Sequence, residues 1–294
     1  MSDTTASLGR KIGTAGDLQS VVRTMKAVAA SNITQYEHAV AALDDYYRTV
    51  QLGLGACLRE IAPPAAPAPI KRKDTGFIAA VVFGSDQGLV GQFNDVMADF
   101  VIKTLAVLPS SKMVWTIGER IRSRLTESDL VVGHSFTLPV SIDAITPLVG
   151  KILIDIEALR EKEETAHICI FYNSPHLGSN YWPTCQHLLP LDAVWQRDMA
   201  AMAWPTHILP EVMNDSHATL LAFVREYLFV SLFRACAESL ASENASRLAA
   251  MQRAEKNIDE LLEDLSRAFH RLRQSGIDDE LFDVITGFEA LARD

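Results

Sequence analysis

The sequence predicts an α/β protein in which an antiparallel two-helix coiled coil, formed by the N- and C-terminal helices, is joined to a central α/β lobe with a mostly parallel sheet. Both ends of the 294-residue chain carry long helical apolar patterns. The middle alternates short apolar runs with amphipathic segments, which is typical of strands connected by crossover helices. The terminal helices can cover their apolar stripes by pairing, and the direction of the chain makes that pair antiparallel.

The composition is that of a folded protein and argues against several functions. Hydrophobic residues make up 48% of the chain and charged residues 22%, a balance that supports a packed core. The formal net charge of −10 argues against a nucleic-acid-binding protein. The longest apolar run, residues 77–83, is far shorter than the roughly 20 residues that a membrane-spanning helix needs.

Targeting and redox signals indicate a cytosol-like compartment. Residues 1–10 lack the basic start and apolar run of a secretory signal, so we expect the protein to stay on the side of the membrane where it is made. None of the cysteines has C-x-x-C spacing, which is typical of reduced thiols. They are Cys57, Cys169, Cys185 and Cys236.

Residues 1–60 are predicted to form one long helix. From Leu18 to Val50 the apolar side chains recur at steps of three and four with no proline, which favours packing along a partner helix. Residues 61–74 follow as a stiff, proline-rich basic linker. We expect its run Lys71-Arg72-Lys73 to be solvated, and contact with an anionic membrane surface is the alternative.

Residues 75–192 are predicted to form the central α/β lobe. The continuous apolar run at 77–83 suits a strand that is buried on both faces. The predicted strands are 77–83, 112–117, 130–140, 166–172 and 181–191, and the predicted helices are 93–108, 119–127 and 143–159. A short connection precedes the last strand, which is therefore expected to be an antiparallel edge. The alternation predicts a Rossmann-like lobe.

Residues 193–213 are predicted to be a connecting loop, and residues 214–294 to form the second long helix. No proline follows Pro210, and apolar residues return at helical spacing. Gly276 interrupts this pattern, because glycine in a helix interior costs about 1 kcal/mol. It marks either a bend or a break before Asp278.

Three segments carry a specific resemblance. Residues 25–31 read Met-Lys-Ala-Val-Ala-Ala-Ser, residues 85–94 read Ser-Asp-Gln-Gly-Leu-Val-Gly-Gln-Phe-Asn, and residues 240–251 read Leu-Ala-Ser-Glu-Asn-Ala-Ser-Arg-Leu-Ala-Ala-Met. A closing segment contains Arg273, Gln274, Ile277, Glu280, Leu281, Val284 and Ile285. In order and position these segments resemble the signature blocks of the gamma chain family of ATP synthases, over essentially the whole chain.

The resemblance implies a non-catalytic rotor subunit, the central stalk of an F-type ATP synthase. Such a stalk couples ion flow through a membrane ring to ATP synthesis or hydrolysis on the beta subunits. The implied partners are the alpha and beta subunits, epsilon and the membrane c-ring, with no nucleic acid, cofactor or metal. The implied location is the cytoplasmic face of the plasma membrane, as a peripheral subunit. The residues implied to contact the alpha/beta ring are Met25, Lys26, Arg247, Arg273, Gln274 and Glu280.

The sequence also departs from the family. Gamma chains commonly place several cations after the first block, whereas residues 32–38 here read Asn-Ile-Thr-Gln-Tyr-Glu-His. Asp278 and Asp279 replace polar residues, and residues 89–92 read Leu-Val-Gly-Gln where Leu-Cys-Gly-Gly is common. These changes indicate a divergent branch, such as a second ATPase beside a housekeeping one.

Two further segments resemble ligand sites, one for phosphate and one for zinc, but have simpler structural interpretations. Residues 84–91 follow a strand and precede a helix, as a phosphate loop does, but lack its lysine and its glycine spacing, so a turn that lets helix and sheet pack closely is favoured. The mirrored pairs His167-x-Cys169 and Cys185-x-His187 offer four zinc ligands, but residues two apart on a strand share a face whatever their identity, so buried thiols and hydrogen-bonded imidazoles are favoured.

Two other functional classes stay open at this point. One is a small α/β nucleotide-using enzyme with helical arms, and the other is a coiled-coil scaffold unrelated to ATP synthases. A hydrolase is not favoured, because no G-x-S-x-G segment occurs in the sequence.

Overall fold

The computed structural model describes residues 4–61, 76–163, 166–176, 181–208, 210–211 and 215–291. The chain divides into two compact units, Met1–Ala29 with Leu248–Asp294, and Ala30–Arg247. The unit that contains the sheet therefore also includes parts of both terminal helices, beyond the predicted lobe at 75–192. The linker run Lys71-Arg72-Lys73 lies outside the described residues.

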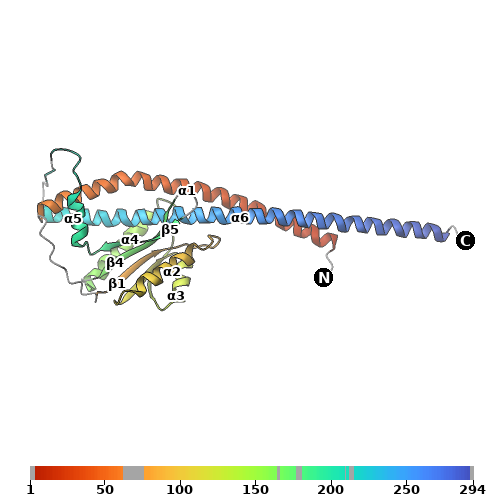
Figure 1. Ribbon diagram of the computed structural model, residues 1–294, viewed down its shortest axis with the longest axis horizontal. Helices are drawn as coiled ribbons and strands as arrows, with labels where there is room; N and C mark the ends of the chain where they lie inside the picture. The colour runs from red at the N-terminus through yellow and green to blue at the C-terminus, as the bar shows by residue number, and fades with distance from the viewer. Residues whose placement is uncertain are drawn as a thin grey trace. The chain divides into compact units, whose positions relative to one another are not determined.

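The two long terminal helices of the prediction are present. Helix α1 spans Thr5–Ile61 and helix α6 spans Ser216–Leu291 (Figure 1). Gly276 lies within α6 without interrupting it, because a single glycine weakens a helix but leaves its hydrogen-bonding pattern intact. None of the described helices carries an apolar stretch long enough to cross a membrane.

Contacts between α1 and α6 run antiparallel within each unit. In the first unit, Gln19 of α1 donates a hydrogen bond to Asp259 of α6, and Arg23 pairs with Glu255. In the second unit, the contacts of α1 with α6 join Asn32 to Asn244, Asp44 to Arg234, and Tyr47 to Tyr227. As numbers rise along α1, partner numbers fall along α6, which confirms the antiparallel pairing.

A mostly parallel five-stranded sheet forms the centre of the second unit. Its strands are β1 (Ile78–Phe83), β2 (Lys112–Ile117), β3 (Val131–Phe136), β4 (His167–Pro175) and β5 (Tyr181–Leu189), in the order β3-β2-β1-β4-β5. Neighbouring strands are parallel except β4 and β5, which are antiparallel. The antiparallel edge strand of the prediction is therefore confirmed, and so is burial of β1 on both faces.

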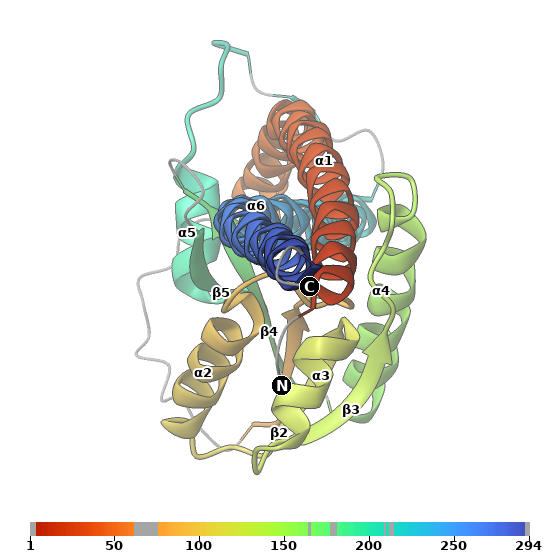
Figure 2. The same ribbon diagram turned by 90° about the vertical axis from the view of Figure 1, so that its right-hand side faces the viewer.

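Helices cover both faces of this sheet (Figure 2). Helices α2 (Phe93–Ala106) and α3 (Glu119–Thr126) pack on the face that contains Ala80, Val82 and Val114. Helix α4 (Ile145–Lys162) packs on the opposite face with buried residues of α1 and α6. That face carries Val81, Phe83, Trp115 and Ile170 among others, and it forms the larger part of the core.

A short helix occupies part of the predicted connecting loop. Helix α5 spans Ala193–Ala201, and the side chain of Asp192 caps it by accepting a hydrogen bond from the Trp195 backbone N–H at 2.8 Å. Arg59 of α1 donates to the backbone oxygens of Ala200 and Met202 at the other end of α5. The two Arg59 contacts come from a distant part of the sequence, which explains why local pattern alone predicted a loop here.

Candidate functional site

The third signature segment, residues 240–251, presents buried polar side chains on helix α6. In the second unit Ser242, Glu243, Asn244 and Ser246 are all at least 92% buried. Buried polar groups are costly unless they are hydrogen-bonded, so their partners determine what the segment does. Most of these partners lie on other elements of the same unit.

Two serine hydroxyls fasten α6 to the sheet layer. Ser246 Oγ donates to the backbone oxygen of Val90, which lies in the second signature segment, at 2.5 Å. Ser242 Oγ donates to the backbone oxygen of Asn173 in β4 at 2.9 Å. Both hydrogen bonds are buried, so α6 is held at two points four residues apart, which is one turn of the helix.

A charged group adds a second attachment between α6 and β4. Glu238 of α6 is buried and accepts hydrogen bonds from Ser174 Oγ and from Arg234 Nε, both at 2.7 Å. Arg234 in turn reaches Asp44 of α1 at 3.0 Å. Sheet, α6 and α1 are therefore connected through one hydrogen-bonded chain of side chains.

An ion pair, Glu243 with Arg247, lies beside these attachments within α6. The carboxylate and the guanidinium approach to 2.6 Å, Glu243 is 3% exposed, and the Arg247 side chain is 14% exposed. Burial raises the pKa of Glu243 above its ordinary value of 4.5, while the charge of Arg247 acts in the opposite direction. Glu243 Oε2 and Arg247 Nε have no hydrogen-bond partner among the described residues, so the pair depends on a single contact.

The glycine-containing loop of the second segment is held together by its own side chains. Asn94 accepts from the Ser85 backbone N–H at 3.0 Å and donates to Ser85 Oγ at 2.8 Å. Asp86 accepts from the backbone N–H groups of Glu119 and Leu138. The polar side chains of the loop thus form hydrogen bonds that link the end of β1 to α2 and α3. This arrangement favours a structural turn over a phosphate-binding loop.

Gly84 explains why this loop contains a glycine directly after β1. A Cβ atom on Gly84 would lie 2.3 Å from Ile121 Cβ of α3, a distance that side chains do not tolerate. The close approach of helix and strand therefore requires glycine, as the sequence interpretation proposed.

A Gly84→Ala substitution is expected to lower the free energy of unfolding by about 1–3 kcal/mol, because the added methyl group overpacks the α3 contact. Gly150→Ala is the matched control. Gly150 lies within α4 with open space around it, so alanine there should be neutral or stabilising by about 0.4–1 kcal/mol. Chemical denaturation of the two variants measures both effects, and equal stabilities would contradict the packing role of Gly84.

The first signature segment lies in the other unit, and its polar contacts also stay within the chain. Glu255 of α6 accepts from Lys26 Nζ at 2.5 Å and from Arg23 Nε at 2.8 Å. The hydrogen bond from Lys26 has the largest effect on the pKa of Glu255 and the hydrogen bond from Arg23 the next largest. Both lower this pKa. Met25 packs beside Val22 in the cluster with Met251. Met25 and Lys26 therefore stabilise the pairing of the two helices.

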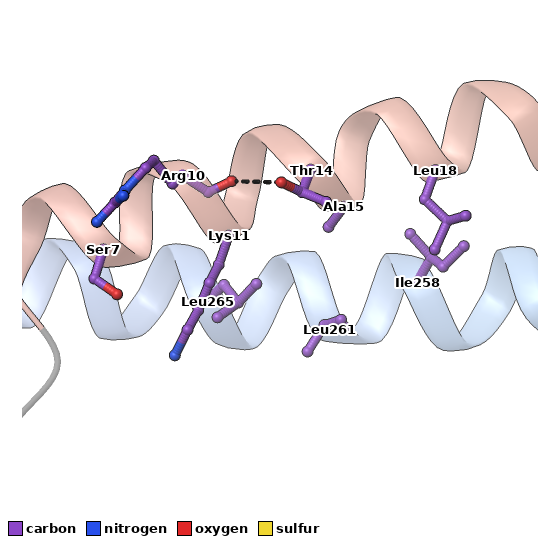
Figure 3. Close-up of a pocket in the computed structure, with 9 residues that line it drawn as sticks. All are labelled: Ser7, Arg10, Lys11, Thr14, Ala15, Leu18, Ile258, Leu261 and Leu265. Carbon is purple, nitrogen blue, oxygen red and sulfur yellow. Dashed lines mark hydrogen bonds between the residues drawn. The ribbon is translucent and has the colours of Figure 1, made fainter. Parts of the chain in front are cut away.

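A groove between α1 and α6 lies further along the same unit (Figure 3). It encloses about 630 Å³, and its apolar lining includes Leu18 and Leu261, which are each about half exposed. Arg10 and Lys11 of α1 also line it, so the groove combines an apolar lining with positive charge. The remaining lining residues are Ser7, Thr14, Ala15, Ile258 and Leu265.

The closing segment of α6 is exposed. Arg273, Gln274 and Glu280, three of the six residues implied to contact partners, lie on the helix surface. Large apolar side chains around them are also exposed, between 44% and 68%. These are Ile277, Leu281, Phe282, Val284 and Ile285. Exposed apolar side chains in such density on a single helix are typical of a surface that another chain covers.

The four candidate zinc ligands meet in pairs. His167 Nδ1 and His187 Nε2 lie 3.3 Å apart, and a side-chain hydrogen bond joins Cys169 to Cys185. In the part of the chain that the structure describes, no group of three or more His, Cys, Asp or Glu side chains is arranged to hold a metal ion. The zinc alternative therefore gains no support from this arrangement.

Comparison with known proteins identifies the family. The family model described as ATP synthase matches residues 4–291. The ATP synthase gamma chain of Syntrophus aciditrophicus is 27% identical, and the match covers 97% of both chains. This chain belongs to the ATP synthase gamma chain family. It is accordingly a subunit of the ATP synthase central stalk, and the resemblance drawn from the signature segments is confirmed.

Solved structures of ATP synthases share the fold. A chain of the mitochondrial ATP synthase of Euglena gracilis, in the OSCP/F1/c-ring part, superimposes with a TM-score of 0.67 at 15% identity and covers 98% of this chain and 94% of that one. The central stalk and c-ring structure from Tetrahymena thermophila gives a TM-score of 0.57 at 20% identity, over 80% of this chain and 99% of that one. The predicted combination of long terminal helices and a mostly parallel sheet is the fold that these chains share with this one.

Sequence reasoning about this gamma chain missed most of the residues that fasten α6. Ser242, Ser246 and Glu238 were not singled out, and neither were Asn173 and Ser174 of β4. One signal was available, because Ser239, Ser242, Glu243 and Ser246 recur at helical spacing and so form a polar stripe. A polar stripe in a helix that must pack on a sheet indicates buried hydrogen bonds.

Proposed function

We propose that this chain is the rotor of an F-type ATP synthase or ATPase and couples ion flow through a membrane ring to ATP synthesis or hydrolysis on beta subunits. The buried attachment of α6 to β4 and to the glycine-containing loop carries the proposal. A rotor biases catalytic sites only through contacts that differ between its orientations. A rotor therefore needs a stiff connection between the part that the membrane ring turns and the part that contacts the catalytic subunits.

We propose that the chain itself is non-catalytic and binds no cofactor or metal. Support comes from the loop at residues 84–94, where Ser85, Asp86 and Asn94 are engaged with the chain's own backbone and side chains. A nucleotide-binding loop instead directs such groups toward phosphate. Residues 75–192 then serve as the lobe and residues 1–60 and 214–294 as the helices of the shaft.

The proposed partners are alpha and beta subunits around the helices, and epsilon and the c-ring at the lobe. The assemblies that contain the similar Euglena and Tetrahymena chains, described as F1 and c-ring structures, support this assignment. The proposed location is the cytoplasmic face of the plasma membrane, as a peripheral subunit.

The six residues implied to bind partners divide into two groups under this proposal. Arg273, Gln274 and Glu280 are exposed and are proposed to contact the alpha/beta ring. Lys26 and Arg247 already pair with Glu255 and Glu243 within the chain, so we propose that they act first by stiffening the shaft. A contact of Lys26, Arg247 or Met25 with the alpha/beta ring would be additional to this stiffening.

Reconstitution tests the proposal. The full chain is mixed with alpha and beta subunits from the same genome, the complex is purified, and ATP hydrolysis is measured with and without the chain. We expect co-purification and a marked rise in multisite turnover, with no ATP bound by the chain alone in equilibrium dialysis. Tight ATP binding by the isolated chain supports the enzyme alternative, and failure to co-purify supports an unrelated scaffold. Either result overturns the proposal.

A further inference from the structure

Two cysteines lie side by side on the β4–β5 hairpin, away from the attachments of α6 described above. In the antiparallel register, Cys169 of β4 is opposite His187, and Cys185 of β5 is opposite Phe171. Residues two positions apart on a strand share a face, so the cysteines are diagonal neighbours on one face of the sheet. The register therefore brings the two thiols together, and each changes the pKa of the other.

The two thiols differ in exposure and in acidity. Cys185 is exposed and Cys169 is half-buried. The hydrogen bond from Cys169 lowers the pKa of Cys185 and raises that of Cys169, because the Cys185 sulfur accepts and the Cys169 thiol donates. Cysteine reactivity follows thiolate character and access, so Cys185 is the better nucleophile of the pair.

The other two cysteines provide an internal comparison. Cys57 of α1 and Cys236 of α6 are both buried. Burial raises the pKa of each thiol, which keeps both protonated and out of reach of a reagent in solution. Selective chemistry at Cys185 can therefore be distinguished from general oxidation of the chain.

We propose that Cys185 and Cys169 form a peroxide-reactive dithiol site that closes reversibly to a cross-strand disulfide. The thiolate of Cys185 attacks one oxygen of a hydroperoxide, the O–O bond breaks, and the departing alkoxide or hydroxide takes a proton. This step leaves a sulfenic acid on Cys185. The Cys169 sulfur then attacks the Cys185 sulfur, the S–O bond breaks, and water carries away the hydroxyl group with the Cys169 proton.

The position of the pair suits this closure. Diagonal neighbours are farther apart than directly opposite residues, so the S–S bond requires a small shift of one strand. Strand β5 is at the edge of the sheet, and among the described strands it pairs with β4 alone, so a shift of β5 disturbs one set of strand contacts. Further along, β4 carries Asn173 and Ser174, which hold α6. The disulfide therefore links β5 covalently to β4, the strand whose Asn173 and Ser174 bond to α6.

The test uses the reduced full chain and hydrogen peroxide as the probe. After brief treatment, free thiols are blocked with N-ethylmaleimide and the digest is mapped by mass spectrometry. We expect one linked peptide pair containing Cys169 and Cys185, a loss of two hydrogen atoms, and full reversal by dithiothreitol. Cys57 and Cys236 should remain alkylated by the blocking reagent after denaturation, as free thiols.

Two variants make the result decisive. In Cys169→Ser the sulfenic acid on Cys185 persists and is trapped by dimedone, because no second thiol is present to displace the hydroxyl group. Cys57→Ser should behave as the wild type. A wild-type chain that gives a dimedone adduct on Cys185 without the linked peptide overturns the proposal, as does oxidation of all four cysteines at equal rates.

Discussion

Replacing Arg247 with methionine is expected to lower the free energy of unfolding by about 3–5 kcal/mol, because it leaves the buried carboxylate of Glu243 without its charge partner. Methionine keeps most of the side-chain volume, so the loss reports the missing charge rather than a cavity. Thermal or urea unfolding followed by near-ultraviolet circular dichroism measures the loss, since Trp115 is buried in the sheet.

Arg225 on the same helix is the matched control. Its guanidinium lies 2.7 Å from Glu157, close to the 2.6 Å of the buried pair, but the two side chains are 71% and 55% exposed. Exposed ion pairs contribute about 0–1 kcal/mol, so Arg225→Met should have a small effect. A second variant that changes Glu243→Leu together with Arg247→Met should recover much of the lost stability. Equal losses for Arg225→Met and Arg247→Met would refute a special role for the buried pair.

The effect of Arg247→Met should depend on pH in a defined direction. Burial raises the pKa of Glu243 in the folded chain above its ordinary value of 4.5, and removing Arg247 raises it further. A carboxyl group with a raised pKa stabilises the fold most at low pH, and that contribution is lost as pH rises through the folded pKa. The stability deficit of Arg247→Met should therefore be smallest below the ordinary pKa of 4.5 and grow as the pH rises through the raised folded pKa of Glu243. A constant deficit across this range would show that Glu243 does not carry the effect.

Ending the chain after Gln274 is expected to weaken coupling strongly while the lobe stays folded. The removed segment carries no buried side chain among residues 275–286, so unfolding of the sheet-containing unit should be unchanged. It does remove the exposed apolar surface formed by Ile277, Leu281 and Val284, which helical spacing places on one face. We expect ion transport per ATP hydrolysed to fall several-fold in vesicles that contain the reconstituted complex, with ATP hydrolysis retained.

Two variants separate the length of the helix from its surface. Ending the chain after Thr286 keeps the apolar face and should preserve most of the coupling. Changing Ile277, Leu281 and Val284 to serine in the full-length chain removes the face but keeps the helix, and should reproduce the truncation. If the truncated chain couples as well as the full-length chain, the closing segment is not a working contact with the ring.

Much of this fold could be predicted because its elements leave local patterns. The apolar stripe from Leu18 to Val50 and the proline-free segment after Pro210 each indicated a long helix, and each is present. The run at 77–83 indicated a strand buried on both faces, because parallel central strands show no alternation. Gly84 indicated close packing of helix on sheet, which the contact with Ile121 explains.

Other features depend on which residues meet across long stretches of chain. The first and third signature segments were recognised as blocks, but nothing in them showed that Lys26 pairs with Glu255 or that Ser246 reaches Val90. The cysteines at 169 and 185 were noted as a possible zinc set, whereas the structure joins them as a thiol pair beside a histidine pair.

The sequence by itself determined the family, the long terminal helices, and a mostly parallel sheet with an antiparallel edge strand, because periodicity and signature residues are properties of neighbouring positions. Only the tertiary structure decided that Glu243 is buried against Arg247, that Ser242 and Ser246 fasten α6 to the sheet, and that α5 forms at Ala193–Ala201. The physical reason is that burial and hydrogen-bond partners depend on the register between α6 and elements more than sixty residues away. A stripe of polar residues on a helix looks the same in sequence whether water or a sheet covers it.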